Sequence, residues 1–501
     1  MGLGAVVRRT EHGIPHILAR DIYHTWVNQS RTVERLLAGP PPIGPSSQAR
    51  ELVRGYAAGY NRYLAERTVA GLPDAACRGA GWVRPITELD VWRRAYQIAE
   101  LNGGEAASYA IASAAPPGTA ADPALVPAAD ASPRTPTGAS HSPRTPAGLA
   151  SNAIGIGRAA SAGRTGLLLA NPHLPWNGDL RLYQPHLTIP GELDVSGAGF
   201  YGLPVVNIGH NDRLAWSHTA STAQTTTMSR LTLVPGDPTS YLLDGRPRRM
   251  EQATVRVTVP RADGQLGQVS HKVYRTPDGP IVAGGSVPWS QEHAYAMRDA
   301  NAGNLRVLDQ TLDMGRSRDV TRLHESLTRH LGIPWANTIA ADADGAAYFS
   351  GVQVVPHVSD ELIGRCGSRT EYGEIVLDGS RSSCGWGSDA DAVAPGLLGP
   401  GRLPTLTRTD SFNLMTDEWE PASGESLPDV AHGSSFIMAV ELTAAGPRTR
   451  TLLTYGQSSN VGSPYRTDQA RRYSAKRWVT ERFTPAEITS DPALRVRTLR
   501  R

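Results

Sequence analysis

The first part of the chain carries apolar residues at helical spacing. Across residues 32–64 they recur at intervals of three and four, as with Val33, Leu36, Val53 and Tyr60, and this spacing predicts amphipathic helices. A further helix is predicted for residues 88–101. Residues 4–22 show instead two short strand-like runs around a Gly-Ile-Pro turn, which predicts a hairpin.

The period changes to two after residue 150, and Gly, Pro, Asn and Asp separate the apolar runs. This pattern predicts strands, with one helical stretch near residues 304–331. The predicted strands lie at 152–157, 166–170, 181–189, 193–199, 205–209, 214–220, 228–234, 434–442 and 449–455, with hairpins across 241–283. The chain is therefore expected to be α+β, with a helical domain at 1–113 and a strand-rich domain at 151–501.

Residues 114–150 separate these two domains. They consist mainly of Pro, Ala, Thr, Ser and Gly, and the run Ser-Pro-Arg-Thr-Pro occurs twice, at 132–136 and 142–146. Such a composition buries too little apolar surface to fold. The segment is either an interdomain linker or a spacer that is excised or left loose after self-cleavage, and both interpretations predict a disordered segment.

Ser151 begins the first strand directly after this spacer. If the Ala150–Ser151 bond were cut, Ser151 would carry a hydroxyl and a free α-amine, a group whose ordinary pKa is about 8. A single residue would then supply a nucleophile and the base that takes its proton, directly or through a water molecule. The alternative is a surface serine that begins a strand.

Composition narrows the possible partners. The 501 residues carry a formal net charge of +3, and 19% of them are charged, as in ordinary globular proteins. The arginines are scattered, without the basic stripe that a nucleic-acid groove requires. The start has no cationic segment followed by an apolar run, and no apolar stretch is long enough to span a bilayer. We therefore expect no nucleic-acid or membrane partner, and the compartment is unknown.

Cysteine and glycine patterns give little sign of a cofactor. Cys366 and Cys384 flank one short segment and are either bridged or two nearby thiols, and Cys77 is expected to be unpaired. No CxxC or close Cys/His cluster occurs. No carboxylate loop for Mg²⁺ or Ca²⁺ is evident, and the Gly-Ile-Gly run at 155–157 lacks the context of a phosphate site. No cofactor or metal is expected.

Ordered sequence blocks identify a family resemblance. They are Ser-Asn-Ala at 151–153, Asn-Pro-His-Leu-Pro-Trp-Asn-Gly at 171–178, Leu-Thr-Ile-Pro-Gly at 187–191, Gly-Leu-Pro-Val-Val-Asn-Ile-Gly at 202–209 and Leu-Ala-Trp-Ser-His-Thr at 214–219. Together they resemble the start of the β chain of the penicillin acylase family of N-terminal nucleophile hydrolases. The resemblance is to the branch of acyl-homoserine lactone, aculeacin-type and penicillin V acylases. It continues to the C-terminus.

This resemblance implies the four-layer αββα sandwich of N-terminal nucleophile hydrolases. It also implies self-cleavage between Ala150 and Ser151, which leaves α and β fragments of one chain. The family usually cuts a Gly-Ser bond, so Ala150 is a departure. Family members are periplasmic or secreted, which favours the disulfide between Cys366 and Cys384.

The resemblance also implies roles for individual residues. Ser151 is the expected nucleophile, His173 the histidine that assists or orients it, and Ala220 the backbone N–H donor to the oxyanion. The acyl pocket would be lined by apolar residues, each of which also suits plain core. They are Leu174, Phe200, Leu203 and Trp335.

Two family segments are missing. One, expected after Tyr23, would hold the partner of Cys77. The other, expected after Asp410, would hold the oxyanion asparagine and an active-site arginine, and Asn413 is a weak substitute. Loss of one oxyanion donor typically lowers the rate by about 10²–10³-fold.

Three functions compete on these grounds. The first is an amidohydrolase that removes an acyl chain from a small-molecule amide, such as an acyl-homoserine lactone, a lipopeptide or penicillin V. The second is an inactive or incomplete relative that keeps the fold and acyl-ligand binding without turnover, which the missing asparagine favours. The third, an adhesive or carbohydrate-binding β protein, explains the strands but not the ordered blocks.

Overall fold

A computed structural model gives the fold of most of the chain. It describes residues 14–75, 77–119, 150–176, 178–221, 223–260, 266–284, 287–370, 373–386, 393–395, 398–403, 406–408, 415–416, 430–460 and 462–497. The proposed spacer lies almost wholly outside these residues. The division into domains at 113 and 150 therefore stays a prediction.

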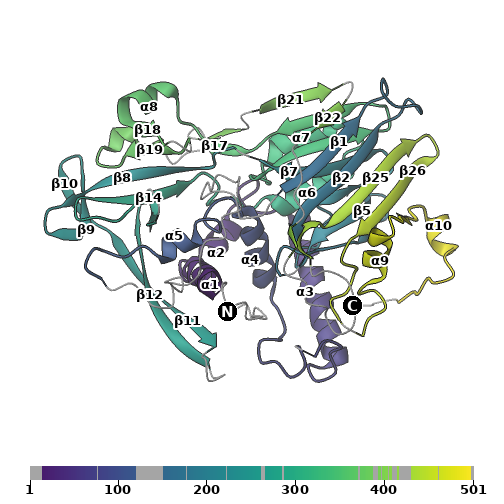
Figure 1. Cartoon of the computed structure of the whole chain (residues 1–501), viewed down its shortest axis with the longest axis horizontal. Helices are drawn as coiled ribbons and strands as arrows, with labels where there is room; N and C mark the ends of the chain where they lie inside the picture. Colours follow the sequence, from purple (N-terminus) through teal and green to yellow (C-terminus); the bar gives the residue numbers. More distant parts are fainter. Residues whose placement is uncertain are drawn as a thin grey trace.

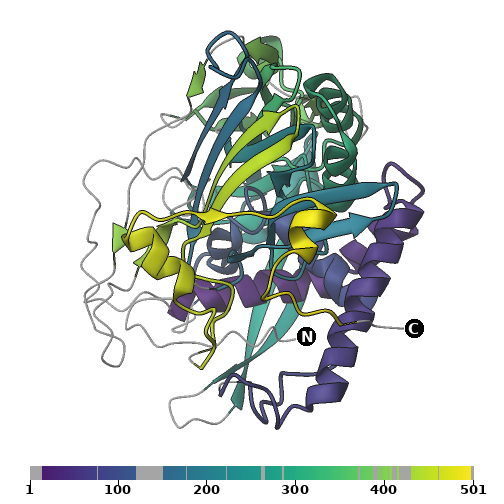
Figure 2. The ribbon, with the colours of Figure 1, turned by 90° about the vertical axis from the view of Figure 1, so that its right-hand side faces the viewer.

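The N-terminal part is helical, as its apolar spacing predicts. Its helices are α1 (Ile14–Gln29), α2 (Thr32–Ala38), α3 (Ser47–Arg67), α4 (Glu88–Ala99) and α5 (Ser108–Ala112). Ser46 caps α3, and Thr87 with Asp90 forms a capping box on α4, which satisfies backbone N–H groups at the helix starts. Figure 2 shows α3 along one edge of the molecule.

The predicted hairpin at residues 4–22 is wrong from residue 14 onward. Residues 1–13 lie outside the described part, and Ile14 begins a helix rather than a strand. Pro15 suits the first turn of a helix. Leu18 and Ile22 are spaced four residues apart and are both buried. Burial of this helical face outweighs the strand-like local pattern.

The first sheet contains Ser151. Its strand order is β22-β1-β2-β25-β26-β27, and β24 pairs with β2 and β23. Its strands are β1 (Ala150–Ile156), β2 (Leu167–Pro175), β22 (Leu406–Arg408), β23 (Met415–Thr416), β24 (Val430–Ser434), β25 (Phe436–Thr443), β26 (Gly446–Leu453) and β27 (Val479–Thr480). The C-terminal strands therefore pair back beside β2, as predicted.

The second sheet faces the first. Its order is β21-β16-β15-β7-β6-β5-β3, with β4 beside β5. The helices α6 (Val307–Arg316) and α7 (Val320–His330) pack on its outer side (Figure 1). Its strands are β3 (Leu182–Tyr183), β4 (His186–Ile189), β5 (Leu193–Phe200), β6 (Ile208–His210), β7 (Leu214–Ala220), β15 (Ala336–Asp342), β16 (Ala347–Gly351) and β21 (Leu398–Leu403).

A third sheet forms the remaining large layer, in the order β10-β9-β8-β14-β13-β12-β11, with β19 beside β8 and β18. Its strands are β8 (Thr226–Val234), β9 (Asp237–Leu243), β10 (Arg246–Arg249), β11 (Glu251–Pro260), β12 (Leu266–Thr276), β13 (Gly279–Val282), β14 (His293–Asp299), β18 (Gly367–Arg369) and β19 (Ile375–Asp378). The hairpin of β11 and β12 reaches past α1 (Figure 1).

Short elements complete the description. The strand β17 (Val354–Pro356) pairs with β20 (Val393–Pro395), and α9 (Asp468–Ser474) and α10 (Pro485–Thr489) lie near the C-terminus. A disulfide joins Cys366 at the end of α8 (Asp360–Cys366) to Cys384 in the 3₁₀ turn η1 (Ser382–Cys384). In the part of the chain described, no helix combines the length and apolarity that a membrane span requires.

One apolar core joins the helical part to the two facing sheets. It contains Ile98 of α4, Leu174 of β2, Trp216 of β7 and Phe436 of β25. Residues on both sides of the predicted cleavage position therefore build the same interior. This arrangement places the end of α4 against the two facing sheets, the first of which holds Ser151.

Candidate active site

Ser151 lies on β1, where pairing with β2 fixes its neighbours. Ser151 is opposite Pro172, and Ala150 is opposite His173. The carbonyl of Pro172 accepts hydrogen bonds from both the backbone N–H (2.9 Å) and the hydroxyl (2.8 Å) of Ser435. The segment around Ser435 thus holds the strand that faces Ser151.

Alternation along β1 directs Ser151 toward the second sheet. A Cβ placed on Gly155 would lie 3.5 Å from Cγ2 of Ile339 in β15. Side chains two residues apart share a face of a strand, so Ser151 and Ala153 face the same way as Gly155. Ser151 is partly buried and therefore lies between the two sheets.

A narrow apolar cavity of about 30 Å³ lies beside Ser151. This volume has room for a water molecule or two. The cavity brings together five of the residues singled out from the sequence: Ser151, Leu174, Phe200, Ala220 and Trp335. Its other walls come from Ile98, Pro172, Leu182, Asn207, Ile208, His218, Thr219, Val307 and Ile333.

Two other predicted site residues, His173 and Leu203, do not line the cavity. His173 is fully buried on β2, where it pairs with Ser434, and its role stays a prediction. Leu203 is also fully buried, and its carbonyl accepts a 2.8 Å hydrogen bond from the hydroxyl of Tyr183. Asn413 lies outside the described residues.

Trp335 connects the second sheet to α4. Its indole N–H donates a 2.7 Å hydrogen bond to the carbonyl of Ile98. Its ring meets that of Phe200 edge to face, with centroids 6.2 Å apart. Ile98 lines the cavity too. This contact therefore joins a wall residue that precedes the predicted cleavage position to one that follows it.

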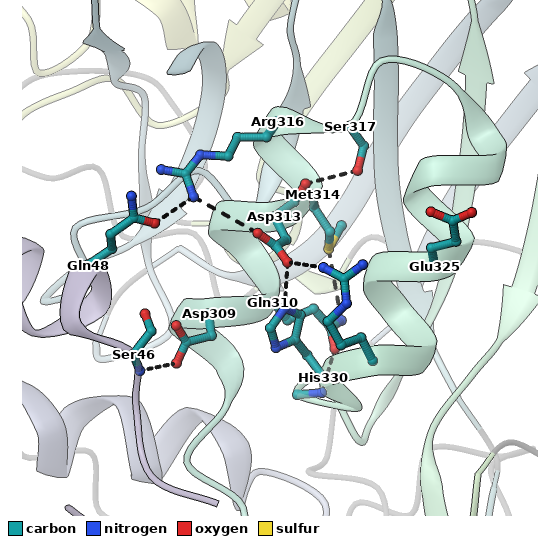
Figure 3. Close-up of polar contacts among 12 residues, drawn as sticks. Ser46, Gln48, Asp309, Gln310, Asp313, Met314, Arg316, Ser317, Glu325 and His330 are labelled. Atoms are coloured by element: carbon teal, nitrogen blue, oxygen red, sulfur yellow. Dashed lines mark hydrogen bonds and ion pairs between the residues drawn. The ribbon is translucent and has the colours of Figure 1, made fainter. Parts of the chain in front are cut away.

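Another wall, α6, is anchored by polar contacts at its outer side (Figure 3). Asp313 accepts a 2.6 Å hydrogen bond from His330 of α7, and this bond holds the pKa of Asp313 below its usual value. The backbone N–H of Ser46 donates to Asp309 at 3.1 Å. These contacts fix the helix that presents Val307 to the cavity.

The strand register leaves the N–H of Ala220 pointing away from β15. Ser221 N–H donates to the carbonyl of Trp335 (3.0 Å), so this pair is hydrogen-bonded across the two strands. Hydrogen-bonded pairs alternate with non-bonded pairs in antiparallel sheets. The next pair, Ala220 with Ala336, is therefore non-bonded. The N–H of Ala220 points toward the side of β6, whose pairing with β7 reaches only Trp216.

His218 is a cavity residue to which the sequence pattern and the family resemblance assigned no role. Burial lowers its pKa to about 4, so the imidazole is neutral near pH 7. Its Nδ1 lies 3.3 Å from the carbonyl of Asn337 and 3.2 Å from the hydroxyl of Thr338. Alternation along the strand, which places position 218 on the same face as Ala220, could have indicated it.

All three cysteines lie within the described residues. The disulfide resolves the open question about Cys366 and Cys384, whereas Cys77 is a half-buried free thiol. Burial, followed by the charge of Asp74, raises the pKa of this thiol. Within the described ranges, no group of three or more His, Cys, Asp or Glu residues is arranged to hold a metal ion.

The family model and the individual relatives that match this chain agree on one protein family. The model of the penicillin amidase family matches residues 8–416 and 409–490. An aculeacin-A acylase of Actinoplanes utahensis is 42% identical over 443 residues, which are 86% of this chain and 55% of that protein. The acyl-homoserine lactone acylase PvdQ of Pseudomonas putida is 42% identical over 402 residues, which are 80% of this chain and 50% of that protein. The chain therefore spans about half the length of these relatives.

The fold also resembles a solved structure. Thermostable penicillin G acylase from Alcaligenes faecalis superposes with a TM-score of 0.54 at 12% identity, covering 70% of this chain and 99% of that one. This likeness, together with the mixed helices and antiparallel sheets, confirms the predicted α+β fold of N-terminal nucleophile hydrolases.

Proposed function

Since the chain belongs to the penicillin amidase family, we propose that it is a self-processing amidohydrolase that removes an acyl chain from an amide. The observation that carries this proposal is the position of Ser151. It lines an apolar cavity together with Ala220 and Trp335, and it directly follows the spacer, at the bond that would be cut. A nucleophile for self-cleavage and turnover needs both properties, and Ser151 combines them.

The first step in this proposal releases the α-amine of Ser151. The hydroxyl oxygen of Ser151 attacks the carbonyl carbon of Ala150, and the Ala150–Ser151 amide becomes an ester as the nitrogen takes the proton. Water then hydrolyses the ester and leaves a carboxylate on Ala150. The new α-amine stays in place because β1 remains paired with β2.

Turnover would then use this amine as the base. It takes the proton of the Ser151 hydroxyl, directly or through water, while the oxygen attacks the acyl carbonyl. The N–H of Ala220 stabilises the oxyanion, and the buried His173 keeps the nucleophile oriented. The leaving amine departs with the proton, and water hydrolyses the acyl-enzyme on Ser151.

The proposed substrate class follows from the cavity lining. Leu174, Phe200 and Trp335 present apolar surface, which suits the alkyl or aryl part of an acyl group. A cavity of about 30 Å³ does not hold a long acyl chain. Binding would therefore require its walls to separate, and the contact between Trp335 and Ile98 is where they meet. Relatives named for aculeacin A and acyl-homoserine lactones support this class.

A non-catalytic acyl-binding protein is the second candidate. The chain covers 50–55% of the two relatives described above, and the sequence pattern predicts that the family segment with the oxyanion asparagine is missing. Such a protein would keep the cavity and bind acyl ligands without turnover.

Intact mass spectrometry of the purified protein tests the proposal. Wild type should separate into residues 1–150 and 151–501, whereas Ser151→Ala should stay one chain. Ser359→Ala is the matched control, since Ser359 only caps α8 and this variant should be cut like wild type. Acyl amides of graded chain length then test turnover. One uncut chain in wild type would contradict self-processing, and fatty-acid binding without product release would favour the second candidate.

A further inference from the structure

The peptide group after Ala220 is held at both of its polar atoms. The side-chain amide of Asn337 donates a 3.2 Å hydrogen bond to the carbonyl of Ala220. The N–H of Ser221, in the same peptide group, donates to the carbonyl of Trp335. Ala220 is the last residue of β7, where a strand would otherwise fray.

Asn337 also holds the preceding peptide group, which carries the N–H of Ala220. Asn337 is opposite Thr219 in the register, and alternation from the bonded pair of Ser221 and Trp335 makes this a hydrogen-bonded pair. The backbone N–H of Asn337 therefore donates to the carbonyl of Thr219. The side-chain amide lies 3.4 Å from the hydroxyl of the same threonine. One residue thus fixes the peptide groups on both sides of Ala220.

We propose that Asn337 is a positioning residue that aims the N–H of Ala220 at the oxyanion. This inference rests on the proposed function. Asn337 is absent from the cavity wall, so it acts through Ala220 rather than on the substrate. A donor to a developing negative charge is effective only when its direction is set before the reaction. This direction matters most if the second oxyanion donor of the family is missing, as the sequence pattern predicts.

The decisive variant is Asn337→Asp. The carboxylate matches the amide in shape but accepts where the amide donates, so it repels the carbonyl of Ala220. Removing one oxyanion donor costs about 10²–10³-fold, and we expect misdirection to lower kcat by about 10–100-fold. KM should change by less than about threefold because the acyl cavity is untouched.

The pH profile of this variant separates positioning from a merely structural role. When the carboxyl introduced at position 337 is protonated, it donates a hydrogen bond as the amide does. The ratio of variant to wild-type kcat at the same pH should therefore rise toward one as the pH falls through the pKa of that carboxyl. The ratio removes the titration of the Ser151 amine, since both proteins share it.

Asn211→Asp is the matched control. The side chain of Asn211 is buried and donates to the carbonyls of Gly315 (3.0 Å) and Ser317 (2.7 Å). It lies before the first residue of β7, at the opposite end from Ala220. This variant should lose stability while its kcat stays within about threefold of wild type.

Hydrogen exchange of the backbone amides in residues 214–221 tests the same idea without any substrate. Exchange should be faster in Asn337→Asp than in wild type and in Asn211→Asp. Unchanged exchange would overturn the inference whether or not the protein is active. Faster exchange with unchanged kcat would overturn the role at the oxyanion. A wild type that neither cuts itself nor turns over would refute the proposed function instead, while exchange still reports on how Asn337 holds the end of β7.

Discussion

Two buried carboxyl groups join the helical part to the third sheet. Glu100 follows the last residue of α4, and Asp299 is the last residue of β14. A methyl group on Gly103 would collide with Oδ2 of Asp299 and lie 3.2 Å from Oε2 of Glu100, so the two carboxyls meet at one point. Within the described residues, neither forms an ion pair with Lys, Arg or His.

Burial is the main cause of the pKa shifts of this pair. It raises the pKa of Glu100 well above its usual value, and the charge of Asp299 raises it further. Burial also raises the pKa of Asp299 to about 6. The hydroxyl of Tyr23 and the N–H of Gly104 each donate to Oε2 of Glu100 at 3.2 Å. The pair therefore holds a proton on Glu100 to a higher pH than an exposed Glu would.

This proton makes the free energy of unfolding depend on pH. An unfolded Glu loses its proton near a pH of about 4.3, whereas folded Glu100 keeps it. Stability falls with pH wherever the folded state binds more protons. Above about pH 5, as long as folded Glu100 keeps its proton, this group should therefore lower the free energy of unfolding by about 1.4 kcal/mol per pH unit.

Glu100→Gln should remove this contribution, because an amide donates to Asp299 without taking up a proton. Over that pH range the variant should gain about 1.4 kcal/mol per pH unit relative to its parent. Urea unfolding followed by tryptophan fluorescence measures this, in a Ser151→Ala background that keeps the chain in one piece. Glu34→Gln is the control, since Glu34 pairs with Arg93 at 2.8 Å. Parallel pH profiles for Glu100→Gln and its parent would refute the reasoning.

Two further predictions concern stability. Replacing Cys366 and Cys384 together with serine should cost about 3 kcal/mol, because the bridge closes a loop with a sequence separation of 18 residues; a melting temperature equal to that of the reduced wild type would confirm that the bridge alone is responsible. Burial opposes the ionisation of Glu481, yet His210, 3.4 Å away, helps to hold the pKa of Glu481 below its usual value. This pair should stabilise the fold above about pH 4.3 and lose its effect as the pH falls through the lower folded pKa. Glu481→Gln should therefore make the free energy of unfolding depend less on pH in this range, and an unchanged profile of urea midpoint against pH would contradict this.

Local patterns correctly predicted helices and strands whose buried face matches the spacing of their apolar residues. The helix expected at 88–101 is α4, and the alternation at 214–220 gives β7. The ordered blocks also identified Ser151 and Ala220, which the structure places beside one cavity. Their chemical roles stay predictions.

Local sequence patterns could not predict contacts between segments that are distant in the sequence. Nothing in the sequence near Glu100 indicates Asp299, because their approach depends on how the segment after α4 meets the end of β14. Asn337 could not be found either, since its importance comes from the register of β15 with β7. The hairpin prediction near Ile14 failed for the same reason. This segment is helical because a helix buries Leu18 and Ile22, and a local pattern does not show that burial.

The covering of α1 by the hairpin of β11 and β12 has a consequence for synthesis. Leu18 and Ile22 of α1 share a core with Val255 and Val257 of β11. A ribosome adds about 5–20 residues per second, so roughly 12 to 47 s pass between the synthesis of residue 22 and that of residue 255. During this interval the apolar face of α1 lacks its final cover. The nascent chain is then open to aggregation, and a chaperone that binds near its N-terminus would protect it.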